Sequence, residues 1–130
     1  MSTIPDDLKY TRSHEWVRTL SGGRFEIGIT DHAQSALGDL VFVEVPAAGR
    51  VFGAGEACAV VESVKAASDV YCPIGGTLIE GNAVLADRPE LVNEDPYGAG
   101  WLFRIEGGAA PLPALLDAAE YTAYLAADAK

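Results

Sequence analysis

The chain has 130 residues, 49% of them hydrophobic, with a formal net charge of −10 and a pI near 4.4. This balance predicts one globular domain over residues 1–130 with its core at about 8–126. The strong negative charge repels phosphates and anionic lipid, which excludes nucleic acid and membrane surfaces as partners. No apolar stretch approaches the roughly 20 residues of a membrane span. The acidic N-terminus does not resemble a secretion signal, so we expect a cytoplasmic protein.

Short strands separated by glycine-containing turns recur along the chain, at residues 8–20, 24–29, 40–45, 51–52, 57–63, 68–72, 77–80 and 101–105. Residues 24–29 alternate apolar and polar side chains, which is typical of a half-buried strand. Residues 40–45 are apolar on both faces, and this predicts burial between two layers. Many short strands with little helix predict a mainly β fold, either a sandwich or a flattened barrel.

Two short helices are predicted at the edges of this β structure. A capping box that starts at Asp31 predicts a helix over residues 31–37, and Gly38 supplies its end. Because this segment has few apolar residues, we expect it on the outside of a sheet. A second capping box at Asp117 predicts a C-terminal helix. Between them, residues 89–92 predict a single helical turn.

One lysine stands apart in the middle of the chain. Lys65 is the only lysine away from the ends, and no other positive charge occurs between Arg50 and Arg88. The apolar runs on either side of it predict a β-hairpin with Lys65 at the tip. Three interpretations compete: a solvated surface charge, a Schiff-base nucleophile and an attachment point for a prosthetic group. The neighbouring carboxylates Glu62 and Asp69 keep the ammonium protonated, which disfavours the nucleophile.

Attachment of a swinging arm explains the isolation of Lys65 best. Small neighbours such as Ser63 and Ala66 leave room around the amine for a modifying enzyme. A rigid hairpin holds the arm away from the body, and tethering raises the concentration of its cofactor at partner sites.

Several sequence blocks, taken in order, resemble the H proteins of the glycine cleavage system. They are residues 13–17, 28–34, 37–44, 61–66, 68–71, 89–98 and 100–102. The resemblance extends over nearly the whole chain, and this number of blocks in this order is specific to the family. It implies a barrel-sandwich hybrid of lipoyl-domain type, with two antiparallel sheets and short helices near residues 31–37 and at the C-terminus.

The resemblance implies lipoate in amide linkage on Lys65, with Glu62, Ser63, Val64 and Ala66 as the residues that the attaching enzyme recognises. Biotin carriers place methionines on both sides of the lysine, so Val64 and Ala66 argue against biotin. The implied protein is a carrier with no catalysis of its own. Two cysteines and two distant histidines also speak against a metal site.

The implied partners act on the arm in turn. A glycine decarboxylase with pyridoxal phosphate loads an aminomethyl group, and an aminomethyltransferase passes the methylene to tetrahydrofolate. A dihydrolipoamide dehydrogenase with FAD then reoxidises the dithiol, with NAD as the final acceptor. A lipoate-attaching enzyme is the fourth partner. We expect a monomer, which suits a shuttle.

The loaded arm needs protection, because it carries a cationic amine on a hydrolysable carbon–sulfur linkage. A cleft that excludes water and offers a carboxylate would supply it. In the family the loaded arm folds against the protein, and the motif matches make Ser13, Glu15, His32 and Asp69 the candidates. We expect Glu15 to pair with the amine. In the alternative interpretation, Glu15 and its neighbours only close a sheet edge, and His32 is simply exposed.

Two cysteines lie symmetrically about the lysine, Cys58 and Cys72, seven residues to either side. A cross-strand disulfide is conceivable if the register opposes them, but in a reducing cytosol we favour two small buried hydrophobes. We expect Cys72 to be inert. Two further functions stay open: a lipoyl carrier used in lipoate relay, and an unmodified interaction domain that keeps the fold.

Overall fold

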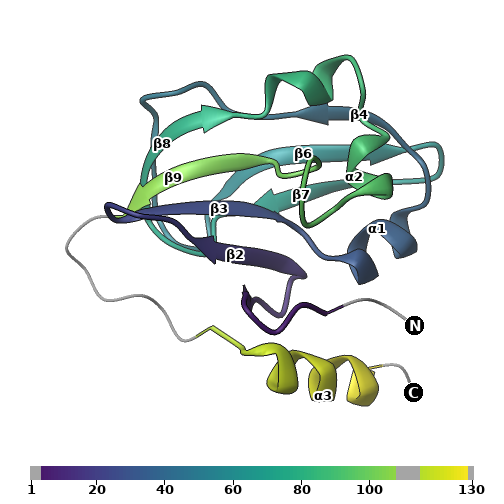
Figure 1. Ribbon diagram of the computed structural model, residues 1–130. Coiled ribbons are helices and arrows are strands. Elements are labelled where there is room, and N and C mark those ends of the chain that lie inside the picture. The colour runs from purple at the N-terminus through teal and green to yellow at the C-terminus, as the bar shows by residue number, and fades with distance from the viewer. Residues whose placement is uncertain (1–3, 108–114, 129–130) are drawn as a thin grey trace.

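The computed structural model describes residues 4–107 and 115–128, which form two antiparallel sheets packed face to face (Figure 1). The larger sheet has the order β1 (Lys9–Tyr10), β2 (Glu15–Thr19), β3 (Arg24–Ile29), β9 (Phe103–Gly107), β8 (Gly76–Gly81) and β5 (Val51–Phe52). The smaller sheet has the order β4 (Leu40–Glu44), β6 (Ala57–Ser63) and β7 (Ala67–Tyr71). The predicted mainly β fold with two antiparallel sheets is confirmed.

Four helical segments accompany the sheets: α1 (Asp31–Leu37), the 3-10 turn η1 (Ala83–Ala86), α2 (Leu91–Glu94) and α3 (Ala118–Asp128). The capping box predicted at Asp117 is confirmed, because Glu120 N–H donates to Asp117 Oδ1 at 2.8 Å and Asp117 N–H donates to Glu120 Oε1 at 3.0 Å. The predicted helical turn at residues 89–92 is displaced by two residues, to α2.

The predicted cap of α1 is wrong by one residue. Thr30 has the extended backbone of an N-cap, with φ −74° and ψ 165°, and its Oγ1 accepts from Ala33 N–H at 3.2 Å. Asp31 is already helical, and its carboxylate instead accepts from the Gln34 side chain at 2.6 Å. The end at Gly38 is confirmed, since its φ of +86° is a conformation that favours glycine.

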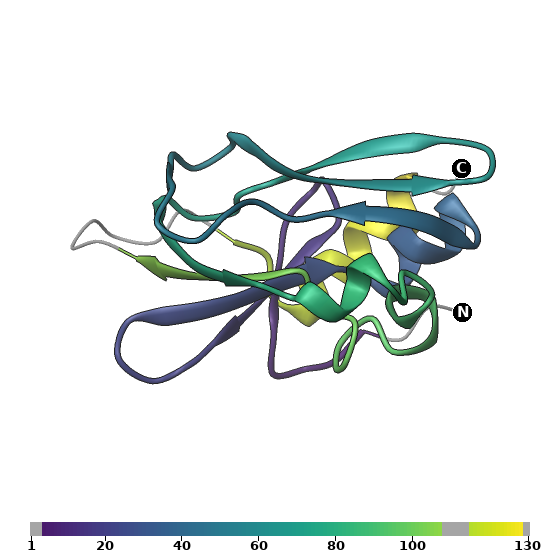
Figure 2. The same ribbon diagram turned by 90° about the horizontal axis from the view of Figure 1, so that it is seen from above.

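The burial predicted for residues 40–45 is also wrong. Leu40 and Val43 face the core, but Val41 and Phe42 are 56% and 46% exposed. The register of β4 against β6 shifts between Leu40 and Phe42, so two consecutive side chains reach solvent. In the described part of the chain, no further layer covers the outer face of the smaller sheet (Figure 2). Apolar residues on both faces of a strand therefore do not mean two buried faces here.

The main core fills the space between the sheets, and a second apolar cluster lies beneath α3. Leu8, Tyr10, Trp16 and Tyr121 form this second cluster on the outer side of the larger sheet. The rings of Tyr10 and Tyr121 stack with centroids 4.7 Å apart. A Cβ on Gly28 would lie 2.7 Å from the Trp16 ring, so only glycine admits the indole there. None of the helices in the described ranges is long and apolar enough to cross a membrane.

Candidate functional site

The predicted hairpin forms, and Lys65 lies at its tip. Ser63 and Ala66 close a loop of two residues, because Ser63 N–H donates to Ala66 O at 2.7 Å. Ala66 N–H donates to Ser63 Oγ at 3.1 Å, so the serine hydroxyl takes the place of a backbone acceptor. Ser63 is 8% exposed, whereas Val64 is 84% exposed and Lys65 is also exposed. The clamped turn therefore presents the lysine on a fixed base.

The Lys65 stem rests beside the end of α1. A Cβ built on Gly38 would lie 3.4 Å from Lys65 Cε and 3.9 Å from Nζ. Asn93 holds this end of α1, since its Nδ2 donates to Gly38 O at 2.9 Å and its Oδ1 accepts from Leu40 N–H at 2.9 Å. Sequence reasoning did not single out Gly38 or Asn93 for this role. Both lie inside the blocks that carry the family resemblance, which is the one signal that pointed to them.

The four residues predicted for recognition share the hairpin but differ in their surroundings. Glu62 lies on β6 opposite Phe42 and Ala67 and is partly exposed. Val64 and Ala66 flank the lysine in solvent. Ser63 points inward and supports the turn, so it shapes the tip and is not itself presented on the surface. The amine itself forms no ion pair with a described residue.

Ser13 and Glu15 are brought together by the structure. Thr11 Oγ1–H and Ser13 Oγ–H both donate to Glu15 Oε1, at 2.7 and 2.6 Å. Tyr71 N–H approaches Glu15 Oε2 at 3.4 Å, which links β2 to the free edge of β7. Glu15 is only 2% exposed. This burial raises the pKa of the Glu15 carboxyl, against the lowering effect of the hydroxyl donors Ser13 and Thr11.

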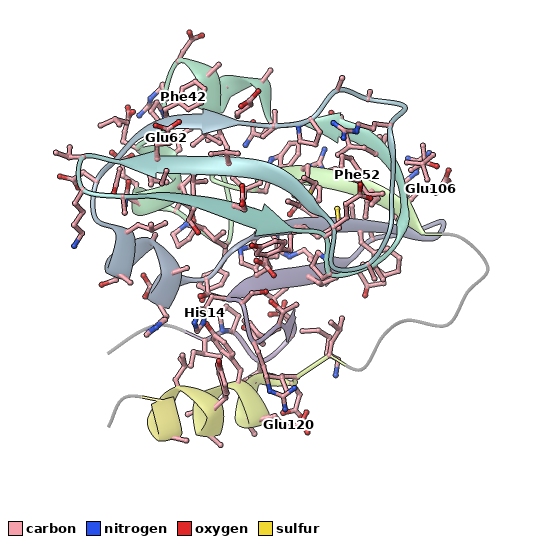
Figure 3. All side chains as sticks on the ribbon, turned by 180° about the vertical axis from the view of Figure 1, so that it is seen from behind. His14, Phe42, Phe52, Glu62, Glu106 and Glu120 are labelled. Atoms are coloured by element: carbon pink, nitrogen blue, oxygen red, sulfur yellow. The ribbon has the colours of Figure 1, made fainter. Side chains whose placement is uncertain are left out.

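His32 and Asp69 are not joined to that pair by any hydrogen bond or ion pair among the described residues. The His32 ring is partly exposed and lies 4.7 Å from the ring of His14, measured between centroids. His14 Nδ1 and Tyr121 OH are hydrogen-bonded at 2.8 Å, which ties this corner to α3 (Figure 3). Asp69 is exposed on β7, opposite Val60. The sequence did not point to His14 as the residue that links this corner to α3.

Both cysteines are free thiols. A register shift between Ala57 and Ala59 offsets Cys58 from the ladder, and its Sγ approaches Val70 O at 3.4 Å. Cys72 lies in the main core and Cys58 packs against it. The neighbouring Cys72 thiol, together with burial, raises the pKa of the Cys58 thiol. This agrees with the interpretation of two packed side chains. Within residues 4–107 and 115–128, no group of three or more His, Cys, Asp or Glu is placed to hold a metal ion.

Comparison with known proteins places this architecture in a family. The model of the glycine cleavage H-protein family matches residues 8–128. The glycine cleavage system H protein of Halorhodospira halophila is 60% identical over 127 residues, covering 97% of this chain and 98% of that one. Its counterpart in Alkalilimnicola ehrlichii is 61% identical over 122 residues, covering 93% and 94%.

A solved structure gives the same result. The glycine cleavage system H protein of Mycobacterium marinum superposes with a TM-score of 0.85 at 39% identity, covering 98% of this chain and 100% of that one. The chain belongs to the glycine cleavage H-protein family. It is therefore a carrier component of that system and not one of its catalysts.

Proposed function

We propose that the protein carries lipoate in amide linkage on Lys65 and serves glycine breakdown as the shuttle between enzymes. The observation that carries this proposal is an exposed amine at the tip of a clamped hairpin, with no ion pair to any described residue. Family membership supports the same assignment. The residues present fit the group, because small side chains flank the lysine and nothing described obstructs the amine.

Lipoate supplies, when bound, a disulfide that accepts the aminomethyl group of glycine and yields its methylene to tetrahydrofolate chemistry. The chain's own residues hold and aim this arm. Ser63 fixes the turn from which Lys65 projects, and Gly38 leaves space for the stem beside α1. The carrier gains no catalytic group from this arrangement. It gains a fixed base and a mobile end, which raises the concentration of the arm at each partner.

For the loaded arm, we keep Ser13, Glu15, His32 and Asp69 as the candidate cleft. Glu15 is the carboxylate that we expect to neutralise the amine, with Ser13 between it and solvent. Its contact with Tyr71 N–H also closes the gap between the two sheets, so both interpretations of Glu15 rest on the same geometry. Glu15→Gln separates them, since a carrier that pairs the amine through Glu15 should lose its load faster in this variant. An unchanged lifetime would leave only the structural role.

The proposed partners are a pyridoxal-phosphate glycine decarboxylase, a tetrahydrofolate-dependent aminomethyltransferase, a dihydrolipoamide dehydrogenase with FAD and NAD, and a lipoate-attaching enzyme. We also propose a cytoplasmic location and a monomeric state. Each enzyme must reach the same arm, and a small monomer with one exposed tip meets this need with the fewest steric conflicts.

Intact-mass analysis of protein from the native host tests the modification. We expect one lipoyl group on Lys65 and none in Lys65→Arg, with the two proteins equally stable because the side chain is exposed. Reconstitution with the decarboxylase and the aminomethyltransferase tests the glycine role. Absence of the lipoyl mass contradicts the carrier assignment. A lipoylated protein that supports no glycine turnover contradicts the glycine role and favours lipoate relay.

A further inference from the structure

The outer face of the smaller sheet is open, and it begins at the hairpin tip (Figure 2). Its outward rows across β4, β6 and β7 are Phe42, Glu62 and Ala67, then Glu44, Val60 and Asp69. The residues between these rows, Val43 and Val61, face the core. In Figure 3, Phe42 and Glu62 lie side by side at the tip end of the sheet. The face is thus continuous with the base of the arm.

Exposed apolar side chains gather at this end of the face. Val41 and Phe42 are 56% and 46% exposed on β4, and Val64 is 84% exposed at the tip. Farther along β4 and β6 there is a hollow of about 280 Å³ whose walls include Glu44, Val60 and Asp69. An exposed aromatic side chain among apolar neighbours, with carboxylates and a hollow farther along the same face, is typical of a protein–protein contact.

The carboxylates of this face are unpaired within the described part of the chain. Glu44, Glu62 and Asp69 form no ion pair there. On the larger sheet, by contrast, Glu26 contacts Arg18 at 2.7 Å and Arg104 at 2.8 Å. Arg50 also lines the hollow beside Glu44 and Asp69, but it is a single positive charge against the three carboxylates of the face. The face therefore keeps a negative potential that a basic partner surface would complement.

We propose that this face docks a folded protein whose own surface sets arginine and lysine side chains around an apolar pocket that takes Phe42. The inference rests on the proposed function, because a protein that handles the arm must approach Lys65, and it adds where that protein binds. It also has a consequence for recognition. Formation of the amide removes the positive charge of Lys65, and no other cation occurs between Arg50 and Arg88. The modified carrier therefore attracts such a partner more strongly than the unmodified one.

The test uses the lipoylated full-length carrier, with the pyridoxal-phosphate glycine decarboxylase of the same organism as the probe. The measured quantity is the KM for the carrier in glycine decarboxylation, with kcat at saturating carrier. Phe42→Ser should raise KM roughly tenfold at unchanged kcat, since aromatic anchors contribute energies of this size. Glu44→Gln should raise KM about two- to threefold and weaken the rise of KM with salt.

Matched controls change similar residues on the larger sheet. Val51→Ser removes an apolar side chain that is 71% exposed, and Glu106→Gln removes an exposed carboxylate. Figure 3 shows Glu106 at the end of the molecule opposite Phe42. Both controls should leave KM unchanged. Intact mass verifies the lipoyl group on every variant, so that poor modification is not mistaken for poor docking.

The three possible failures are distinguishable. Equal KM values for Phe42→Ser and Val51→Ser would overturn the docking face while the carrier function stands. A fully lipoylated wild-type carrier that the decarboxylase does not use would overturn the glycine role itself. Equal KM for Glu44→Gln and Glu106→Gln, with no difference in salt dependence, would overturn the electrostatic part of the proposal.

Discussion

The two sheets use the same residue types in opposite ways. On the larger sheet, Glu26 is buried between two arginines, and Tyr121 of α3 packs against the outer side of this sheet at 0% exposure. On the smaller sheet, Glu62 has no cationic partner among the described residues, and Tyr71 is 39% exposed. The larger sheet together with α3 holds the framework. The smaller sheet presents side chains to solvent, and it is the one that carries Lys65.

This division has a physical logic for a carrier. An arm that visits several enzymes needs a rigid base. The buried aromatic and ionic contacts of the larger sheet and α3 supply this rigidity. On the side that meets partners, charged groups should have no ion pair within the carrier itself, because a charge that is already paired gains little energy from a new contact. Substitutions of like residues on the two sheets should therefore have unlike effects.

The largest contrast in stability is expected between two tyrosines. Tyr121→Ala should cost about 3–5 kcal/mol of unfolding free energy, because it empties a buried aromatic site. The ring stacks on Tyr10 and the hydroxyl bonds to His14 and Thr30, both at 2.8 Å. Tyr71→Ala should cost less than about 1 kcal/mol, as is usual for a partly exposed side chain. Urea denaturation of both variants measures the difference.

Tyr121→Phe refines this contrast by removing the hydroxyl alone. The variant should lose about 1–2 kcal/mol of unfolding free energy, since the buried Thr30 hydroxyl and the partly exposed His14 ring both lose a hydrogen-bond partner. If Tyr121→Ala and Tyr71→Ala were equally destabilised, α3 would not belong to the framework.

The hairpin and the capping box at Asp117 were predictable because their causes are local. Apolar runs around Lys65 have strand periodicity, and the Asp117 capping box needs only residues three positions apart. The exposure of Phe42 was not predictable, since it depends on a register shift against β6 and on the absence of a covering layer. The cap at Thr30 was missed because threonine and aspartate are both good caps, and only the backbone conformation decides between them.

The site divides in the same way. Lys65 was selected as the candidate attachment point from its isolation in the sequence and from the motif around it, and its predicted place at a hairpin tip is confirmed. Gly38 and Asn93, which hold the surroundings of the lysine stem, are separated by more than fifty residues, and only the fold brings them together. His14 likewise meets Tyr121 across the chain. Such contacts leave no periodic signal that one sequence can show.

The second contrast is expected between two glutamates. Glu26→Gln leaves Arg18 without its carboxylate and Arg104 with only Glu80. It should cost about 1–3 kcal/mol of unfolding free energy, because the glutamate is buried although the arginines are partly exposed. Glu62→Gln should stay within about 0.5 kcal/mol of wild type. Thermal unfolding monitored by circular dichroism measures both. A loss for Glu62→Gln as large as that for Glu26→Gln would contradict the division between the sheets.

The third contrast lies within the hairpin. Ser63→Ala should cost about 1 kcal/mol, because the Ala66 N–H loses its side-chain acceptor at 3.1 Å. Ser68→Ala is the matched control, since its hydroxyl is exposed and approaches only Asp69 O at 3.4 Å. The rate of lipoyl attachment, followed by intact mass, should fall for Ser63→Ala and hold for Ser68→Ala. Equal attachment rates would mean that the clamp does not shape the tip.

The smallest effect concerns Glu15, where the two sheets meet. Burial raises the pKa of this carboxyl above its ordinary value of 4.5, so the folded protein binds the proton more tightly than the unfolded chain does. The resulting stability is fully present below the ordinary value and is lost as pH rises through the raised one. Glu15→Gln keeps an acceptor for Ser13 and Thr11 and does not titrate.

Urea midpoints measured at a series of pH values between 4 and 8 should therefore show wild type losing stability relative to Glu15→Gln as pH rises. If the difference in urea midpoint between the two proteins did not change with pH, the raised pKa of the Glu15 carboxyl would be contradicted. If the difference in urea midpoint does vary with pH, the stability of the junction between β2 and β7 depends on the charge of Glu15. A loaded arm that brought its cationic amine to Glu15 would then favour the ionised carboxylate and offset part of the loss, so loading should stabilise wild type more than Glu15→Gln at the upper end of the pH range.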